Sequence, residues 1–174
     1  MKQRIQRLIR VINVFVFKKK LPLQIVVYFH DIDSKELSAI EDIILFFKNL
    51  EYQFVSVSQI SKNFGTENKM FTFTFDDGFK NWINVMPIFE KYNIQATFFL
   101  NSKFLTKENN SEFLKNIALE DESKLISKED INIIVSNNHE IGAHTHSHYK
   151  LSNLTLDLLE KEIETNLKYL NSLY

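Results

Sequence analysis

The sequence predicts an α/β fold built on parallel strands. Short apolar runs rich in β-branched and aromatic residues alternate with stretches whose apolar residues have helical spacing. The runs are nearly continuous in hydrophobicity, which is typical of parallel strands covered by helices on both faces. Polar residues follow several of these runs directly, and in parallel α/β sheets functional groups gather at the C-terminal ends of the strands.

The composition is that of a globular chain with one core. Its 174 residues are 44% hydrophobic and 25% charged, which allows one ordinary domain. The net charge of -1 gives no general electrostatic reason to bind nucleic acid. Because the chain has no cysteine, disulfides and thiolate metal sites are excluded, and His and carboxylate side chains would have to hold any metal.

Residues 1–20 form a basic segment ahead of the predicted domain, which covers residues 21–174. A short apolar run, residues 11–17, is followed by three lysines where a signal peptide would carry small residues. The run is also shorter than the ~20 residues that span a bilayer. We expect an ordinary packed helix and a cytoplasmic protein. Peripheral contact with an anionic membrane through residues 1–20 is the alternative.

The first half of the chain predicts three strands and a helix. Residues 23–29 are an apolar run after a proline, and residues 34–50 repeat apolar residues at helical spacing behind a serine that can cap a helix. Residues 54–58 predict a second strand. Residues 71–75 alternate Phe with Thr, so one face is wholly aromatic, and this strand stops at Asp76.

The second half predicts a helical stretch broken at Pro87 (residues 79–93), a buried strand (95–100) and a polar insertion with some helix (101–125). A helix capped by Ser127 (127–137), a short strand (139–144) and a final amphipathic helix (156–170) follow. His139 is expected on the surface. Trp82 and the phenylalanines are expected in the core rather than as platforms for sugar stacking.

Two polar clusters follow predicted strands and together suggest a metal site. His144 and His148 are four residues apart, so one helical turn would place both rings on one face about 6 Å apart, whereas His146 would point elsewhere. An extended chain would put all three rings on one face, but the residues that follow favour the turn. Asp76 and Asp77 can supply a third ligand and a neighbouring base for hydrolysis.

Three segments, taken in order, resemble a known family. FTFDDG (residues 73–78), ATFFL (96–100) and EIGAHTHSH (140–148) are similar to motifs of the NodB-homology polysaccharide deacetylases, the carbohydrate esterase family 4 enzymes. The resemblance covers roughly residues 23–174. It includes VVYFHDI (26–32), which is similar to the opening strand of many members.

The resemblance implies an incomplete (β/α) barrel and a metal-dependent hydrolase that removes N-acetyl groups from an amino-sugar polysaccharide or a glycolipid sugar. Asp76 takes the position of the general base, and Asp77, His144 and His148 take those of the metal ligands. Zn²⁺ is the expected metal, with Co²⁺ or Ni²⁺ as alternatives. Thr145 takes the position of a small hydroxyl residue in the metal loop, and no residue is assigned to substrate.

The family's later motifs are not found in residues 149–174. These are an Arg-Pro loop, an Asp-Trp segment and a late strand whose His is the general acid. We therefore expect a domain that lacks its later strands. It would be a fragment of a longer protein, a remnant that binds metal or carbohydrate without catalysis, or a half-barrel completed by a partner chain. His30 is expected to be a structural residue at a strand end, with lining of the site as the alternative.

Overall fold

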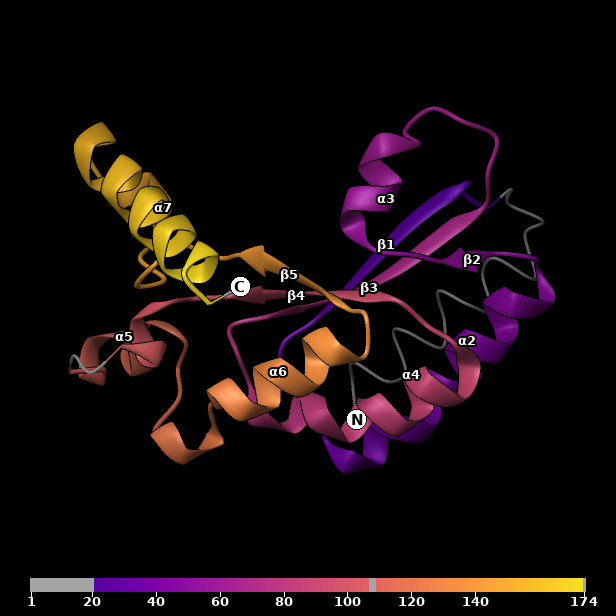
Figure 1. The fold of residues 1–174 in the computed structure, drawn as a ribbon, viewed down its shortest axis with the longest axis horizontal. Coiled ribbons are helices and arrows are strands. Elements are labelled where there is room, and N and C mark those ends of the chain that lie inside the picture. The colour runs from indigo at the N-terminus through magenta and orange to yellow at the C-terminus, as the bar shows by residue number, and fades with distance from the viewer. Residues whose placement is uncertain (1–20, 107–108, 174) are drawn as a thin grey trace.

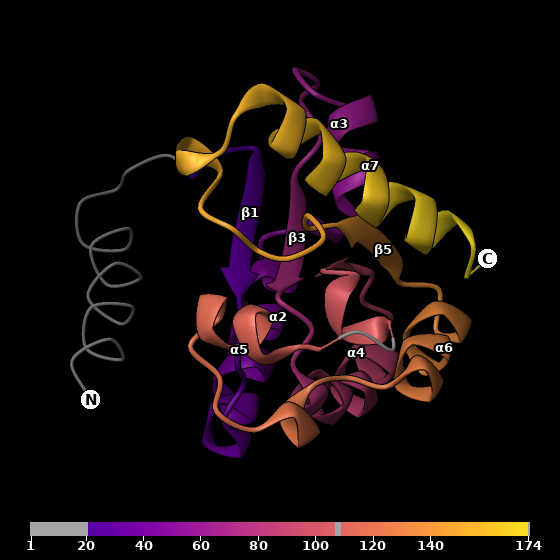
Figure 2. The same ribbon diagram turned by 90° about the vertical axis from the view of Figure 1, so that its left-hand side faces the viewer.

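One parallel sheet, covered by helices on both faces, organises the part of the chain that the structure describes (Figures 1 and 2). The structure is a computed structural model and describes residues 21–106 and 109–173. The predicted basic segment, residues 1–20, lies outside the described residues. The prediction of an α/β fold with parallel strands is confirmed.

The sheet is open rather than closed into a barrel. Its order is β1-β3-β4-β5, β2 also pairs with β3, and every pairing is parallel. Within the described ranges β1 and β5 end the main strand order and β2 pairs with β3 alone, which agrees with an incomplete barrel. The strands are β1 (Gln24–Phe29), β2 (Gln53–Phe54), β3 (Met70–Asp76), β4 (Ala96–Leu100) and β5 (Glu140–Ala143).

The helices form two layers. In Figure 1, α2, α4 and α6 lie on one side of the sheet and α3 and α7 on the other. Their bounds are α2 (Leu37–Asn49), α3 (Val57–Lys62), α4 (Met86–Tyr92), α5 (Ser111–Asn116), α6 (Lys128–Ser136) and α7 (Leu156–Asn171). None of the described helices is long and apolar enough to cross a bilayer.

The central strand β3 is buried on both faces. Phe71, Phe73 and Phe75 are fully buried on one face, and the intervening threonines are 0% and 4% exposed on the other. The Phe75 ring stacks on Phe98 of β4 at 4.6 Å between centroids. This aromatic layer fixes the register of β3 against β1 and β4, because a slip of one residue would exchange the Phe and Thr faces.

Two element predictions are corrected by the structure. The strand predicted over residues 54–58 ends at Phe54, because Ser56 caps α3 and forms a reciprocal capping box with Gln59. The helical stretch predicted over residues 79–93 divides into a 3₁₀ helix, Lys80–Val85, and α4. Pro87 lies in the first turn of α4, where its missing N–H leaves no broken bond.

His139 is buried, so the prediction that it lies on the surface is wrong. The residue is 7% exposed, and its ring packs against Phe89 and Phe98 at 5.6 and 5.5 Å between centroids. The backbone N–H of His139 bonds to the Ile134 carbonyl at the end of α6, which draws the side chain under the sheet. Burial lowers the pKa of His139 to about 4, so the imidazole is neutral in the folded protein at pH 7.

The buried His139 should weaken the fold in mild acid. The unfolded chain binds a proton below the usual pKa of 6.5, whereas the folded chain resists protonation until about pH 4. The free energy of unfolding is therefore unaffected by the titration of His139 above pH 6.5, and it decreases by roughly 3 kcal/mol as the pH falls toward 4. Denaturant unfolding from pH 7 to 4 should show a smaller loss of stability for His139→Leu. An equal loss of stability in His139→Leu and in the unchanged chain would contradict this role of His139.

Candidate metal centre

Polar side chains from four strand ends meet at one edge of the sheet. His30 follows β1, Asp76 ends β3 and Asp77 follows it, Asn101 follows β4, and His144 follows β5. Since all of these strands are parallel, their C-terminal ends lie at the same edge. The sequence places the residues far apart, and the topology brings them together.

Asp77, His144 and His148 form a compact group of three metal-ligand types. Oδ1 of Asp77 lies 3.2 Å from Nε2 of His144 and 3.1 Å from Nε2 of His148. The three atoms lie within 4.8 Å of one another. Asp77 is 4% exposed, whereas the two imidazoles are each about one-third exposed, so the group opens toward solvent on the histidine side.

The burial of Asp77 is compensated by the two imidazoles. Burial alone would raise the pKa of Asp77, but its contacts with His144 and His148 lower that pKa well below its usual range. The contact with Asp77 in turn raises the pKa of His148. Asp77 is therefore a permanent carboxylate at the base of the group.

Asp76 has the opposite electrostatic character. It is half-buried, and burial raises its pKa, although the nearby charges of His144 and His30 lower it in part. Two adjacent carboxyl groups in different environments are suited to different tasks. Asp77 is suited to hold a cation, and Asp76 is suited to exchange a proton.

The chain turns sharply after β3, and a glycine is needed there. Asp77 and Gly78 both have left-handed backbone angles, with φ of 80° and 84°. A Cβ atom on Gly78 would also lie 2.5 Å from the Phe104 ring. The left-handed turn begins directly after Asp76, where the sequence predicts that the strand stops.

The two histidines converge through an irregular loop, so the predicted helical turn over residues 144–148 is wrong. Thr145 and His148 have φ of 65° and 55°, in the left-handed region, which a β-branched residue such as Thr145 avoids. His146 does point elsewhere, as predicted, and its Nδ1 lies 2.8 Å from the Ser102 hydroxyl.

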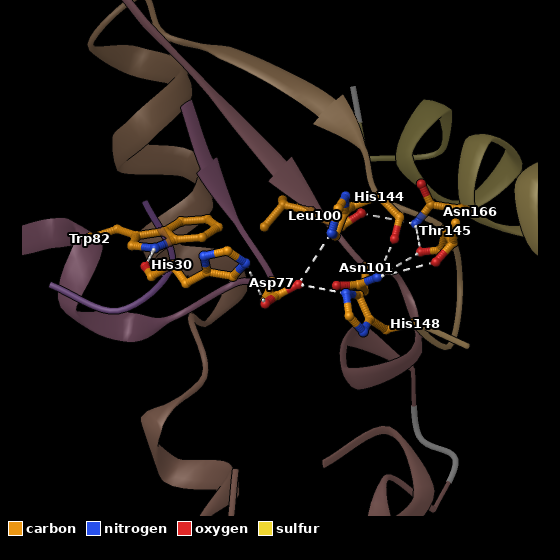
Figure 3. A network of polar contacts seen from close by, with 9 residues as sticks. All are labelled: His30, Asp77, Trp82, Leu100, Asn101, His144, Thr145, His148 and Asn166. Atoms are coloured by element: carbon orange, nitrogen blue, oxygen red, sulfur yellow. Dashed lines mark hydrogen bonds and ion pairs between the residues drawn. The ribbon is translucent and has the colours of Figure 1, made fainter. Parts of the chain in front are cut away.

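Four polar side chains that sequence reasoning missed hold this loop by its peptide groups, and Figure 3 shows two of them, Asn101 and Asn166. Asn101 donates to the His144 and Thr145 carbonyls, and Asn166 donates to the Thr145 carbonyl at 2.7 Å. The Ser147 N–H donates to Glu162 at 2.6 Å, and the Ser147 carbonyl accepts from Asn116 at 2.9 Å. Only Asn101 carried a signal in the sequence, because it directly follows a predicted strand.

His30 lines the site, so the alternative interpretation of this residue holds. Its Nε2 lies 3.6 Å from Oδ2 of Asp77, on the side opposite to His144 and His148 (Figure 3). The side chain is 48% exposed. Trp82 is fully buried, as expected, and its indole N–H donates to the His30 carbonyl at 2.8 Å, which fixes the end of β1.

The donor set fits a divalent metal ion. Two imidazoles and one carboxylate are a common three-ligand set that leaves positions open for water or substrate. No described residue gives Oδ1 of Asp77 a hydrogen bond of normal geometry, although the atom is buried and both Nε2 atoms face it. A shared cation would satisfy this oxygen and both nitrogens together.

A sequence model of a known family matches this part of the chain. The model, described as polysaccharide deacetylase, matches residues 64–174, which include all three candidate ligands and Asp76. No curated protein matches the sequence significantly.

Solved deacetylases share the fold at low sequence identity. The deacetylase PplD of Streptococcus pyogenes, in complex with acetate, is 18% identical with a TM-score of 0.65, over 89% of this chain and 69% of that one. A polysaccharide deacetylase of Bacillus cereus is 19% identical with a TM-score of 0.62, over 86% and 47%. A de-N-acetylase of Aggregatibacter actinomycetemcomitans is 20% identical with a TM-score of 0.53, over 70% and 54%. The chain thus spans about half the length of the last two proteins.

Changing a candidate ligand should abolish metal binding without unfolding the protein. Asp77→Asn removes the carboxylate charge, and His144→Ala removes one of two nitrogens, so neither variant should bind Co²⁺ at concentrations that saturate the unchanged chain. His146→Gln, in the same loop, is the matched control and should bind normally. Competition with a chromophoric chelator measures the affinity. Normal binding by Asp77→Asn would place the metal elsewhere.

Proposed function

The chain belongs to the polysaccharide deacetylase family, hydrolases of carbon–nitrogen bonds other than peptide bonds, and we propose that it removes N-acetyl groups from an amino-sugar polysaccharide or a glycolipid sugar. The observation that carries this proposal is the meeting of Asp76 and Asp77 with the His144 and His148 imidazoles at one edge of the sheet. This group combines a cation-binding set with an adjacent carboxyl group, and such a combination can hydrolyse an amide.

Asp77, His144 and His148 would hold the metal, with Zn²⁺ expected and Co²⁺ or Ni²⁺ as alternatives. A divalent ion at such a site supplies Lewis acidity toward a carbonyl oxygen and makes water more acidic. The buried Asp77 carboxylate would set the position of the cation, because its environment keeps it charged. The two half-buried imidazoles would complete the set from the solvent side.

Asp76 would act as the general base. Its carboxylate takes a proton from water while the water oxygen bonds to the acetyl carbon. The carbon–nitrogen bond then breaks as the proton held by Asp76 passes to the nitrogen, which leaves as the amine of the sugar. The acetyl group leaves as acetic acid, which ionises to acetate. A base with a raised pKa transfers protons more readily near neutral pH than an ordinary exposed carboxylate.

The substrate class follows from this chemistry and from the fold relatives. Acetate, which is bound to the Streptococcus pyogenes deacetylase, is the product that hydrolysis of an N-acetyl group would release. The half-exposed His30 and the one-third-exposed His144 border the open side of the group, where an acetamido sugar would have to approach.

Asp76→Asn should separate catalysis from metal binding. The amide cannot accept the proton, so release of acetate should fall by about 10²- to 10⁴-fold, as for loss of a general base. Co²⁺ affinity should stay near that of the unchanged chain, because Asp76 is not a ligand in this proposal. Acetate would be measured enzymatically, with N-acetylglucosamine oligomers and peptidoglycan as substrates. Asp157→Asn, an exposed change on α7, is the control.

The outcome also separates catalysis from a non-catalytic role. Metal binding with no acetate from any of these glycans would favour a remnant that binds metal or carbohydrate without turnover. Acetate release by Asp76→Asn at the rate of the unchanged chain would remove Asp76 as the base while leaving the metal site in place.

A further inference from the structure

Helix α7 packs on the domain through a stripe in which two polar residues, Glu162 and Asn166, precede one apolar residue, Leu170. Glu162 and Asn166, one turn apart, are 8% and 0% exposed, whereas Leu156 and Ile163 on the same helix are 81% and 42% exposed. Burying a carboxylate and an amide has a cost in free energy unless both make good hydrogen bonds. The stripe therefore needs partners on the domain, and these partners lie in the metal loop.

Both buried side chains bond to peptide groups beside the metal ligands. Glu162 accepts from the Ser147 N–H at 2.6 Å, next to His148. Asn166 donates to the Leu100 carbonyl at 3.0 Å and to the Thr145 carbonyl at 2.7 Å, next to His144. Neither touches the ligand atoms themselves, so each acts through the backbone on which a ligand is mounted.

The loop that they hold would not adopt its shape unaided. Thr145 and His148 lie in the left-handed region, at a cost of about 1–3 kcal/mol each for residues of this kind. Hydrogen bonds to Ser147 and Thr145 lock the peptide groups between these two positions. In their absence the loop would relax toward ordinary backbone angles, and the two imidazoles would no longer face Asp77 together.

We propose that Glu162 and Asn166 are positioning residues, which hold the His144–His148 loop so that both imidazoles bind one metal ion with Asp77. This inference rests on the metal site of the proposed function. It adds that docking of α7 and metal binding are coupled. By linkage, docking of α7 raises the affinity for the metal, and bound metal raises the equilibrium constant for docking by the same factor.

Metal affinity tests the coupling with variants matched on one helix. Glu162→Met keeps the length of the side chain but removes the acceptor, and Asn166→Leu removes the donor at nearly constant volume. Each should weaken Co²⁺ binding by about 10- to 100-fold, the usual effect of changing an outer-shell partner. Glu162→Gln retains an acceptor and should restore affinity most of the way. Glu160→Met, exposed on the same helix, should bind as the unchanged chain does.

Hydrogen exchange gives a readout that general destabilisation would not mimic. In the unchanged chain, added Co²⁺ should slow amide exchange across residues 156–171, and in Asn166→Leu this protection should shrink while that of β3 remains. Unchanged exchange in α7 on saturation with Co²⁺ would overturn the proposal, even if Glu162→Met fails to fold. Affinity of folded Glu162→Met equal to that of the unchanged chain would overturn it as well.

The metal site and the positioning role of Glu162 and Asn166 can be disproved separately. If the unchanged chain binds no Co²⁺, the metal site of the proposed function is wrong, and the coupling falls with it. If the unchanged chain binds Co²⁺ and both α7 variants bind it equally well, only the positioning role is wrong.

Discussion

The carboxylate of Asp77 is the charge on which the rest of the site depends. It is almost fully buried, and a buried charge is tolerated only beside groups that compensate it. The two imidazoles approach from one side and His30 from the other, so Asp77 is surrounded by groups able to carry positive charge. The parallel sheet makes this possible, because it ends β1, β3 and β5 at a common edge. A cation at the same place would meet this requirement more fully than the imidazoles alone can.

Both segments that meet at Asp77 contain left-handed backbone, and each is fixed by a different means. The turn after β3 uses Gly78, which adopts its angle without steric cost and leaves room for the Phe104 ring. The loop after β5 has no glycine at its two left-handed positions. Its conformation depends on hydrogen bonds with amide and carboxylate side chains, which come from the end of β4, from α5 and from α7. The first turn is therefore encoded locally, and the second is encoded by the tertiary structure.

This difference explains what could be predicted from the sequence. The strand and helix order, the DDG turn and the pairing of His144 with His148 follow from local patterns. The geometry of the histidine loop and its support by Glu162 and Asn166 could not be predicted, because polar residues on an amphipathic helix normally face solvent. On α7 the periodicity is real, yet part of its apolar stripe, including Leu156 and Ile163, is exposed. His139 was misjudged for a related reason, since a neutral histidine in an aromatic core has no local signature.

The spacing of the site along the chain gives it a place in the order of folding. His144 follows Asp77 by 67 residues, and Asn166 comes 22 residues after His144. Joining such distant residues closes a long loop, which is entropically unfavourable until the intervening strand and helices have packed. During synthesis, Asp77 and the phenylalanines of β3 would leave the ribosome well before α7 does. The metal site would thus form later than the aromatic layer, and an ion bound there would mark a chain in which the segment from β3 to α7 has packed.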